Sequence, residues 1–195
     1  MFSRLRKLPL VLPTLAAVLA LSACGQSHTR VTTGTYAGEN GANAPYLYVG
    51  PLTYEVQLSR QLNPFNAEDA AYLQGVPVAD RKLEPGQEWF AVFMQVYNST
   101  PRVYKASNDI VISDTENNTY TPFELGGINL FAYRAGPVPP NSRLPVPGTI
   151  ADDAPAQGQL LLYKIQIASL DNRPLEIKIV NPENPSESAS AELDV

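Results

Sequence analysis

Residues 87–97 read Gln-Glu-Trp-Phe-Ala-Val-Phe-Met-Gln-Val-Tyr and are apolar on both faces of an extended chain. Successive side chains of a strand point to opposite sides. The two sets are Trp89, Ala91 and Phe93 on one side and Phe90, Val92, Met94 and Val96 on the other. Such a run suits a central strand covered on both sides, or a strand shielded by a long loop. It stops at residues 98–101, Asn-Ser-Thr-Pro, because proline has no N–H for further pairing.

Several other segments also show strand patterns. In residues 52–59, Leu52, Tyr54, Val56 and Leu58 alternate with polar side chains, which is a period of two. Residues 109–113 and 119–124 flank the turn 114–118 as a hairpin, in which we expect Asn118 to adopt a positive φ. Further strands are expected at residues 146–150, 158–168 and 175–180. This spacing, without alternating helices, predicts an all-β fold: an immunoglobulin-like antiparallel β-sandwich of about seven strands.

Two connections within the predicted sandwich are long. Residues 63–86 contain a stretch typical of one short helix, with Asn66 as its N-cap and acids in its first turn. Residues 125–145 contain Phe131, Tyr133 and Arg134. Aromatic residues and arginine dominate binding hot spots, so these three form the candidate protein-contact surface. The alternative is that this loop folds its aromatic side chains over the open edge of the sandwich.

The first 24 residues are organised as an export signal. Residues 1–7 carry three positive charges and no acid, and residues 8–20 form an apolar run. That run is shorter than the roughly 20 residues that a transmembrane helix needs. It ends in Leu21-Ser22-Ala23-Cys24, which resembles the bacterial lipobox. The resemblance implies cleavage between Ala23 and Cys24 and transfer of a diacylglyceryl group to the Cys24 sulfur. The alternative is an ordinary secretory signal with a cysteine there by chance.

These segments predict the organisation of the whole chain. Residues 1–23 are a lipoprotein signal peptide, and residues 24–45 are a flexible tether that starts at the lipidated Cys24. Residues 46–180 form the sandwich, and residues 181–195 are a disordered acidic tail. The membrane is then a partner through the lipid anchor at Cys24. The expected location is the extracytoplasmic side of the cell membrane, in the periplasm or at the cell surface.

Four segments of the chain share a pattern with one group of known proteins. They are residues 54–56 (Tyr-Glu-Val), residues 93–98 (Phe-Met-Gln-Val-Tyr-Asn), residues 114–122 (Asp-Thr-Glu-Asn-Asn-Thr-Tyr-Thr-Pro) and residues 158–165 (Gly-Gln-Leu-Leu-Leu-Tyr-Lys-Ile). The pattern resembles a family of exported bacterial proteins of unknown function with a telokin-like, immunoglobulin-type fold. Asn118 stands near a position where that family often has glycine, and asparagine tolerates a positive φ. The resemblance covers most of residues 50–180 and implies export and a sandwich, without a particular activity.

Composition limits the chemistry that the chain can perform. Its 195 residues include 14 Lys+Arg, 19 Asp+Glu, one His and one Cys, with a formal net charge of -5. Loss of the three bases in residues 1–7 would leave 11 bases and a net charge of -8. An acidic chain without clustered Lys and Arg argues against a nucleic-acid partner. A single Cys excludes an internal disulfide, and a single His, His28 in the tether, excludes sites with two imidazoles. We therefore expect no metal site and no cofactor.

The remaining side-chain chemistry also favours a protein without catalytic residues. The acid pairs at residues 68–69 and 152–153 are adjacent, and neighbouring side chains on extended backbone point apart. Asp114, Glu116 and Asn118 mimic the start of a Ca²⁺ loop that lacks its glycine and its last glutamate. Lysines on strands, such as Lys164, are expected to face solvent rather than to activate a serine.

The sequence therefore predicts a non-enzyme: a lipid-anchored extracytoplasmic binding or assembly module of the cell envelope, with an exported protein as its partner. One alternative is a chaperone-like or structural envelope accessory that recognises other chains through an exposed sheet edge. A second alternative is a hydrolase that uses carboxylates alone.

Overall fold

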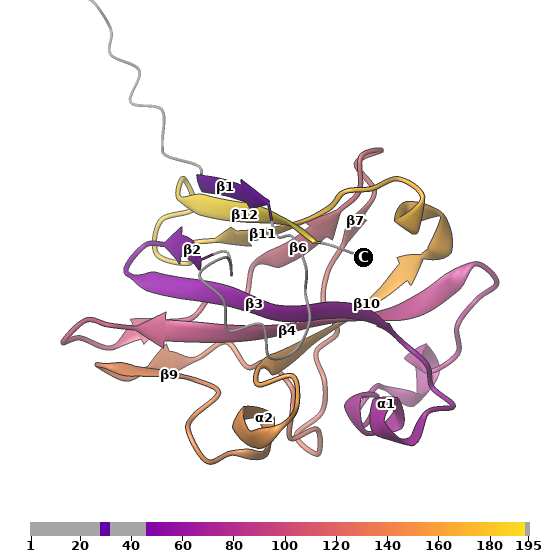
Figure 1. Ribbon diagram of the computed structural model, residues 1–195, viewed down its shortest axis with the longest axis horizontal. Helices are drawn as coiled ribbons and strands as arrows, with labels where there is room; N and C mark the ends of the chain where they lie inside the picture. The colour runs from indigo at the N-terminus through magenta and orange to yellow at the C-terminus, as the bar shows by residue number, and fades with distance from the viewer. Residues whose placement is uncertain (1–27, 32–45, 194–195) are drawn as a thin grey trace, which may run out of the picture.

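The computed structural model describes residues 28–31 and 46–193, and it confirms the predicted all-β sandwich. Two sheets face each other (Figure 1). Sheet A has the strand order β1-β12-β11-β6-β7, and sheet B has the order β10-β4-β3-β2 with β9 paired to the end of β4. Sheet A consists of β1 (His28–Val31), β12 (Ser188–Leu193), β11 (Leu175–Val180), β6 (Ile110–Ser113) and β7 (Thr119–Tyr120). Sheet B consists of β10 (Gln159–Gln166), β4 (Gln87–Asn98), β3 (Leu52–Leu62), β2 (Tyr46–Val49) and β9 (Ser142–Leu144).

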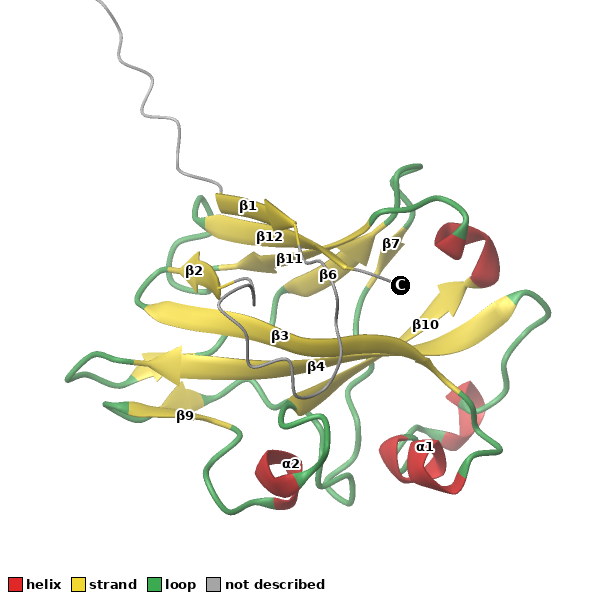
Figure 2. Cartoon of the chain, viewed as in Figure 1, coloured by secondary structure: helices red, strands yellow, loops and turns green. Residues whose placement is uncertain are grey.

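Short elements fill the connections between these strands (Figure 2). They are the strand pair β5 (Tyr104–Lys105) and β8 (Pro137–Val138), the helices α1 (Ala67–Tyr72) and α2 (Ile150–Asp153), and the 3-10 turns η1 (Val78–Asp80) and η2 (Ile167–Leu170). The described chain has more strands than the predicted number because β1, β2, β5, β8, β9 and β12 were not predicted. Helix α1 begins as predicted, because the Asn66 side chain accepts the Glu68 N–H at 2.8 Å.

The apolar run at residues 87–97 lies in β4, the central strand of sheet B. It pairs with β3 on one side and with β10 on the other. Its inward face, represented by Val92, belongs to the core cluster that also contains Ile177 of sheet A. On its outward face, the Phe93 ring meets the Tyr72 ring of α1 edge-on at 4.9 Å. Both faces are therefore buried, as the sequence predicted.

Strand β3 departs from its predicted alternation at one position. Leu52, Tyr54 and Val56 are at most 3% exposed and face the core between the sheets. The pairing with β4 then shifts register between Val56 and Leu58, which is a β-bulge. The bulge turns Leu58 to the other face, where it packs against the cluster outside sheet B.

The prediction of a disordered tail at residues 181–195 is wrong for residues 188–193. These form β12, which pairs with β11 from Ser188 opposite Val180 to Leu193 opposite Leu175. Ala189, Ala191 and Leu193 are at most 2% exposed. Small apolar side chains at every second position suffice to cover one face, but they leave the overall composition polar. The composition of the segment therefore concealed its period of two.

The turn before β12 is also ordered. The Asn181 N–H donates to the Glu187 carbonyl, and the Asn181 side-chain amide donates to the Glu187 carboxylate, each at 2.9 Å. Between β2 and β3, Gly50 has a φ of +56°, and a Cβ there would lie 2.5 Å from the Asn181 amide nitrogen. No larger residue fits at Gly50 without moving Asn181, so the β2–β3 turn and residues 181–187 form one packed end of the molecule.

The prediction of a flexible tether at residues 24–45 is wrong for residues 28–31. These form β1, which pairs in parallel with β12 and adds the one parallel pair among the described strands. Strand β1 binds the backbone N–H and C=O groups along the outer edge of β12. Such backbone pairing needs no side-chain periodicity, so the sequence does not reveal it. The signal peptide, the cleavage site at Ala23 and Cys24, and residues 32–45 lie outside the described residues. Within the described ranges, no helix is long and apolar enough to span a membrane.

Two local predictions also need correction. The strand expected at residues 146–150 is instead a turn that leads into α2. In this turn the Gly148 N–H donates to the Asp152 carboxylate, and the Thr149 hydroxyl donates to the Val146 carbonyl. In the β6–β7 hairpin, the positive φ belongs to Asn117 at 65° rather than to Asn118. The Asp114 carboxylate accepts the N–H groups of Glu116 and Asn118, so the chain must turn sharply at the residue between them.

Candidate functional site

The segment that carries the candidate contact residues is fixed along the outer edge of β10. The Leu160 N–H donates to the Phe131 carbonyl, and the Tyr133 N–H donates to the Leu160 carbonyl, each at 2.8 Å. Between them, Ala132 forms a parallel bridge with Leu160. Phe123 donates its N–H to the Leu162 carbonyl on the same edge at 2.7 Å. Loop backbone thus occupies much of the edge of β10 that a partner strand would need.

Tyr133 points from this segment into the sandwich. Its hydroxyl donates to the Ser107 carbonyl at 2.7 Å, while the Ser107 N–H donates to the Tyr54 hydroxyl at 2.8 Å. Burial raises the pKa of Tyr54 to about 12, although the hydrogen bond from Ser107 acts in the opposite direction. Burial also raises the pKa of Tyr133 and that of Tyr163 nearby. These hydroxyls therefore stay protonated at neutral pH, and Tyr133 serves to anchor the loop.

Arg134 closes the loop that precedes it. Its guanidinium donates to the carbonyls of Gly126 at 3.0 Å and of Leu125 at 3.3 Å. Tyr133 and Arg134 line a cavity of about 540 Å³ at the side of the sandwich, together with Lys105 and Glu124. Its charged side chains have both signs, so the cavity favours no single class of charged ligand.

Phe131 lies on a different surface, a groove between the two helices. Its ring meets the Tyr72 ring edge-on at 4.8 Å. Tyr72, Phe131, Ile150 and Ala154 line this groove, which has a volume of about 400 Å³. We call it the α1–α2 groove. Of the three residues predicted from the sequence, Phe131 alone reaches it, because Tyr133 and Arg134 line the other cavity.

The two acid pairs of the sequence lie beside this groove. In each pair, one acid binds an arginine and the other lines the groove. In the first pair, the Asp69 carboxylate is bound by Arg60 and by the Asn63 N–H, while Glu68 lines the groove. Burial alone would raise the pKa of Asp69, but these hydrogen bonds outweigh it and hold the pKa below its ordinary value.

In the second pair, Asp152 is bound by Arg143 at 2.7 Å and by the Gly148 N–H at 3.0 Å, while Asp153 lines the groove. A hydrolase that uses two carboxyl groups needs one of them desolvated within its site. Glu68 and Asp153, the two acids that line the groove, are both solvent-exposed.

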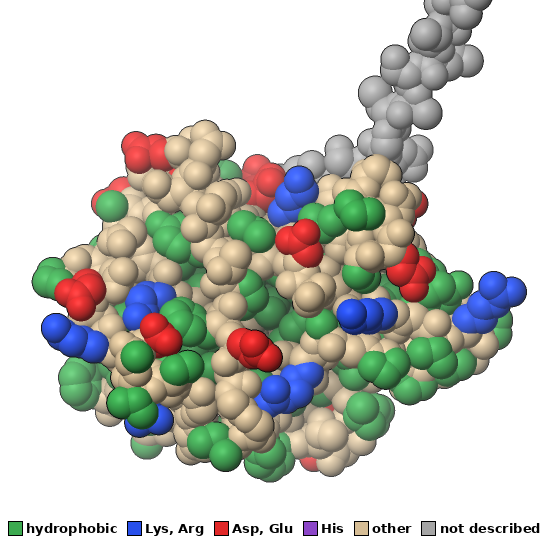
Figure 3. All heavy atoms as spheres, turned by 180° about the vertical axis from the view of Figure 1, so that it is seen from behind, with side chains coloured by type: hydrophobic (Ala, Val, Ile, Leu, Met, Phe, Trp, Pro, Cys, Tyr) green, Lys and Arg blue, Asp and Glu red, His purple; other side chains and the backbone are tan. Residues whose placement is uncertain are grey.

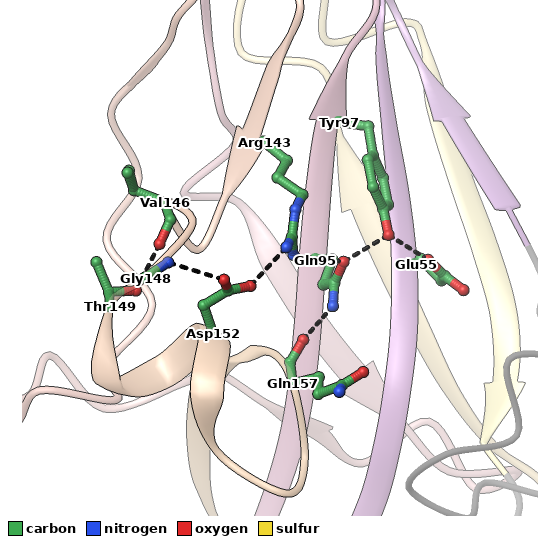
Figure 4. A network of polar contacts seen from close by, with 9 residues as sticks. All are labelled: Glu55, Gln95, Tyr97, Arg143, Val146, Gly148, Thr149, Asp152 and Gln157. Carbon is green, nitrogen blue, oxygen red and sulfur yellow. Dashed lines mark hydrogen bonds and ion pairs between the residues drawn. The ribbon is translucent and has the colours of Figure 1, made fainter.

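A polar network holds α2 in place beside the groove (Figure 4). The Tyr97 hydroxyl donates to the buried Glu55 carboxylate at 2.8 Å and also contacts Gln95. Arg143 of β9 donates to Gln95 at 3.2 Å and pairs with Asp152 of α2. Burial raises the pKa of Tyr97, and the hydrogen bond and charge of Glu55 raise it further. The network thus connects β3, β4, β9 and α2 as a structural support.

The Ca²⁺-like loop is a filled hairpin turn. The Asp114 carboxylate accepts hydrogen bonds from the Glu116 and Asn118 N–H groups, the Asn118 amide and the Ser169 hydroxyl. Burial would raise the pKa of Asp114, but these four donors hold it below its ordinary value. In the part of the chain that the structure describes, no three His, Cys, Asp or Glu residues gather as a metal site would require.

Lys164 does not face solvent as expected. Its ammonium donates to the Asp80 carbonyl at 2.8 Å and lies 5.1 Å from the centre of the Trp89 ring, so its role is to cover the apolar cluster outside sheet B.

On the face seen in Figure 3, Lys and Arg side chains lie apart from one another, with acidic and apolar side chains between them.

Comparison with known proteins finds structural similarities at low sequence identity. No family model matches the chain, and no curated protein matches it by sequence. The fold is similar to that of YcdA of Bacillus subtilis, a candidate lipoprotein, with a TM-score of 0.49 and 8% identity over 76% of this chain and 38% of YcdA. YjhA of Bacillus subtilis gives a TM-score of 0.49 and 10% identity over 77% of this chain and 97% of YjhA.

An uncharacterised β-sandwich protein of Clostridium difficile gives a TM-score of 0.42 and 7% identity, covering 87% of this chain and 97% of that protein. At these scores and identities the comparisons carry nothing about ligands, partners or chemistry over to this chain. The β-sandwich that the telokin-like resemblance implied is confirmed, whereas membership of that family stays a prediction.

Proposed function

We propose that the protein is a lipid-anchored, non-catalytic binding or assembly module on the extracytoplasmic side of the bacterial cell membrane. The observation that carries the proposal is Leu21-Ser22-Ala23-Cys24 at the end of a basic and then apolar leader, with the only cysteine of the chain at its last position. Two acyl chains on Cys24 would supply the two signals that stable membrane anchoring needs.

The position of β1 adds a consequence for how such a module would be held. Three residues separate Cys24 from His28, the first residue of β1, so four Cα–Cα steps join them. Fully extended, these four steps span at most about 14 Å, at roughly 3.3–3.6 Å per residue. A free tether of about 20 residues would have a root-mean-square span of roughly 25 Å. An anchor at Cys24 would therefore hold the end of β1 close to the lipid surface.

Mass spectrometry of the N-terminal peptide tests the anchor directly. In chain purified from bacterial membranes, we expect Cys24 as the first residue, carrying acyl groups. Cys24→Ala should leave the protein unlipidated and poorly processed, whereas the matched variant Ser22→Ala should be processed normally because it keeps a small residue before the cleavage site. An intact Ala23–Cys24 bond in the membrane-purified mature chain would refute the proposal.

A further inference from the structure

The α1–α2 groove combines an apolar lining with two acids that have no ion pair among the described residues. Tyr72 and Ala154 are at most 8% exposed, and Phe131 is half-buried beside them. Ile150 is 52% exposed at the start of α2. The groove volume of about 400 Å³ falls within the roughly 300–1,000 Å³ of typical binding sites. The groove therefore leaves apolar side chains in contact with solvent.

Each helix contributes one acid to the groove. Glu68 comes from α1 and Asp153 from α2, and both are solvent-exposed. Within the described residues, neither carboxylate has a hydrogen bond or an ion pair, whereas the neighbouring acids Asp69 and Asp152 each bind an arginine. Among the described residues, no basic side chain lines the groove, so the side chains that line it carry a net negative charge. The guanidinium of Arg60 lies 5.9 Å from the centre of the Tyr72 ring and is paired with Asp69.

We propose that the α1–α2 groove binds an extended peptide segment that places apolar side chains between lysine or arginine residues. The apolar side chains would fill the space over Tyr72 and Phe131, and the basic side chains would pair with Glu68 and Asp153. The same charges disfavour other occupants. A second copy of a chain with a net charge of -5, an anionic lipid headgroup and a nucleic acid would all meet like charge at Glu68 and Asp153.

This inference rests on the proposed function only in expecting the segment to belong to an exported protein. Binding of a peptide is measured separately from acylation, so the two proposals can fail independently. An acylated chain that binds no basic peptide would refute the groove inference alone. A chain that binds the peptide but is not acylated would refute the anchor alone.

Fluorescence anisotropy tests the inference with the full chain in nanodiscs of phosphatidylcholine, or in buffer if the chain is found unlipidated. The probe is a labelled peptide, acetyl-Gly-Lys-Ile-Phe-Lys-Gly-amide. One comparison peptide replaces both lysines by glutamate, and another replaces Ile-Phe by Ser-Ser. We expect saturable binding of the probe and at least tenfold weaker binding of both comparison peptides. Equal binding of the probe and the glutamate peptide would overturn the charge argument, and no saturable binding of the probe would overturn the site.

Variants locate the binding on the molecule. Ile150→Glu and the double variant Glu68→Lys/Asp153→Lys should each weaken probe binding at least tenfold. All three side chains are exposed, so the fold should persist, and an unchanged melting temperature verifies this. The matched controls are Ile167→Glu, at a residue that is 48% exposed, and Glu116→Lys/Asp171→Lys, which reverses two acids outside the groove. Equal losses in these controls would mean that overall charge, not the groove, binds the peptide.

Discussion

Two buried tyrosines give a matched test of what hydrogen bonding contributes to this core. Tyr54 and Tyr163 are both 0% exposed and belong to the same core cluster. The Tyr54 hydroxyl accepts the N–H of Ser107, which is itself buried, at 2.8 Å. The Tyr163 hydroxyl has no hydrogen-bond partner within the described part of the chain. The same change, tyrosine to phenylalanine, therefore removes a used hydroxyl at one site and an unsatisfied one at the other.

The expected magnitudes follow from the cost of an unsatisfied buried polar group. Tyr54→Phe leaves the Ser107 N–H without an acceptor, which should lower the free energy of unfolding by about 1–3 kcal/mol. Tyr163→Phe removes a hydroxyl that is desolvated without compensation, so it should leave stability unchanged or raise it by about 1 kcal/mol. Burial raises the pKa of both hydroxyls, so neither ionises near neutral pH to complicate the comparison.

Urea denaturation of the two variants measures the difference, provided that the m-value stays at that of the wild type. Thermal melting should show the same order, at roughly 2–4 °C per kcal/mol for a domain of this size. Equal destabilisation by the two substitutions would refute the reasoning, because it would mean that the Tyr163 hydroxyl has a partner such as a buried water. The double variant should then show whether the two sites are coupled.

Three other substitutions test separate parts of the structure. Trp89→Ala should cost about 3–5 kcal/mol in a urea titration, since the ring is 3% exposed and meets the Phe123 ring at 5.4 Å; a wild-type midpoint would contradict its burial. Leu193→Ala should cost about 2–5 kcal/mol because Leu193 is 2% exposed in β12, whereas Ser186→Ala, at an exposed turn residue, should cost little; equal small effects would mean that β12 adds no stability. Asp114→Asn should flatten the loss of stability in acid. The pKa of Asp114 is lowered in the fold, so its hydrogen bonds stabilise above the unfolded pKa of about 4 and are lost as the pH falls through the folded value; melting curves from pH 7 to pH 2 that fall in parallel for both proteins would exclude this role.

The parts of the fold that the sequence predicted are those with strong periodicity and large side chains. The two-faced run of β4 and the alternation of β11 each indicated the correct strand, because a period of two in large apolar residues is typical of strands and does not fit a helix. The cap of α1 was equally readable, since Asn66 and the acids of the first turn are local signals. One prediction failed because the deciding interaction was non-local. Strand β1 exists through backbone pairing with β12, which comes more than 150 residues later in the chain.

The acid pairs show the same limit at the level of the candidate site. From sequence, two adjacent carboxylates on extended backbone should point apart, which argued only against a catalytic pair. The first pair lies on α1, the helix that the sequence predicted, and the second lies on α2, where no helix was predicted. Neighbouring side chains diverge on a helix too, and the fold gives each pair one arginine. Arg60 and Arg143 come from strands of sheet B and not from the helices, so the sequence around the acids does not show which carboxylate each arginine will bind. Once Asp69 and Asp152 are bound, Glu68 and Asp153 keep their charge on the surface of one groove. The charge pattern on which peptide recognition would depend is therefore a product of tertiary structure. If Arg60 paired with Glu68, or Arg143 with Asp153, the groove would lose one of its two unpaired negative charges.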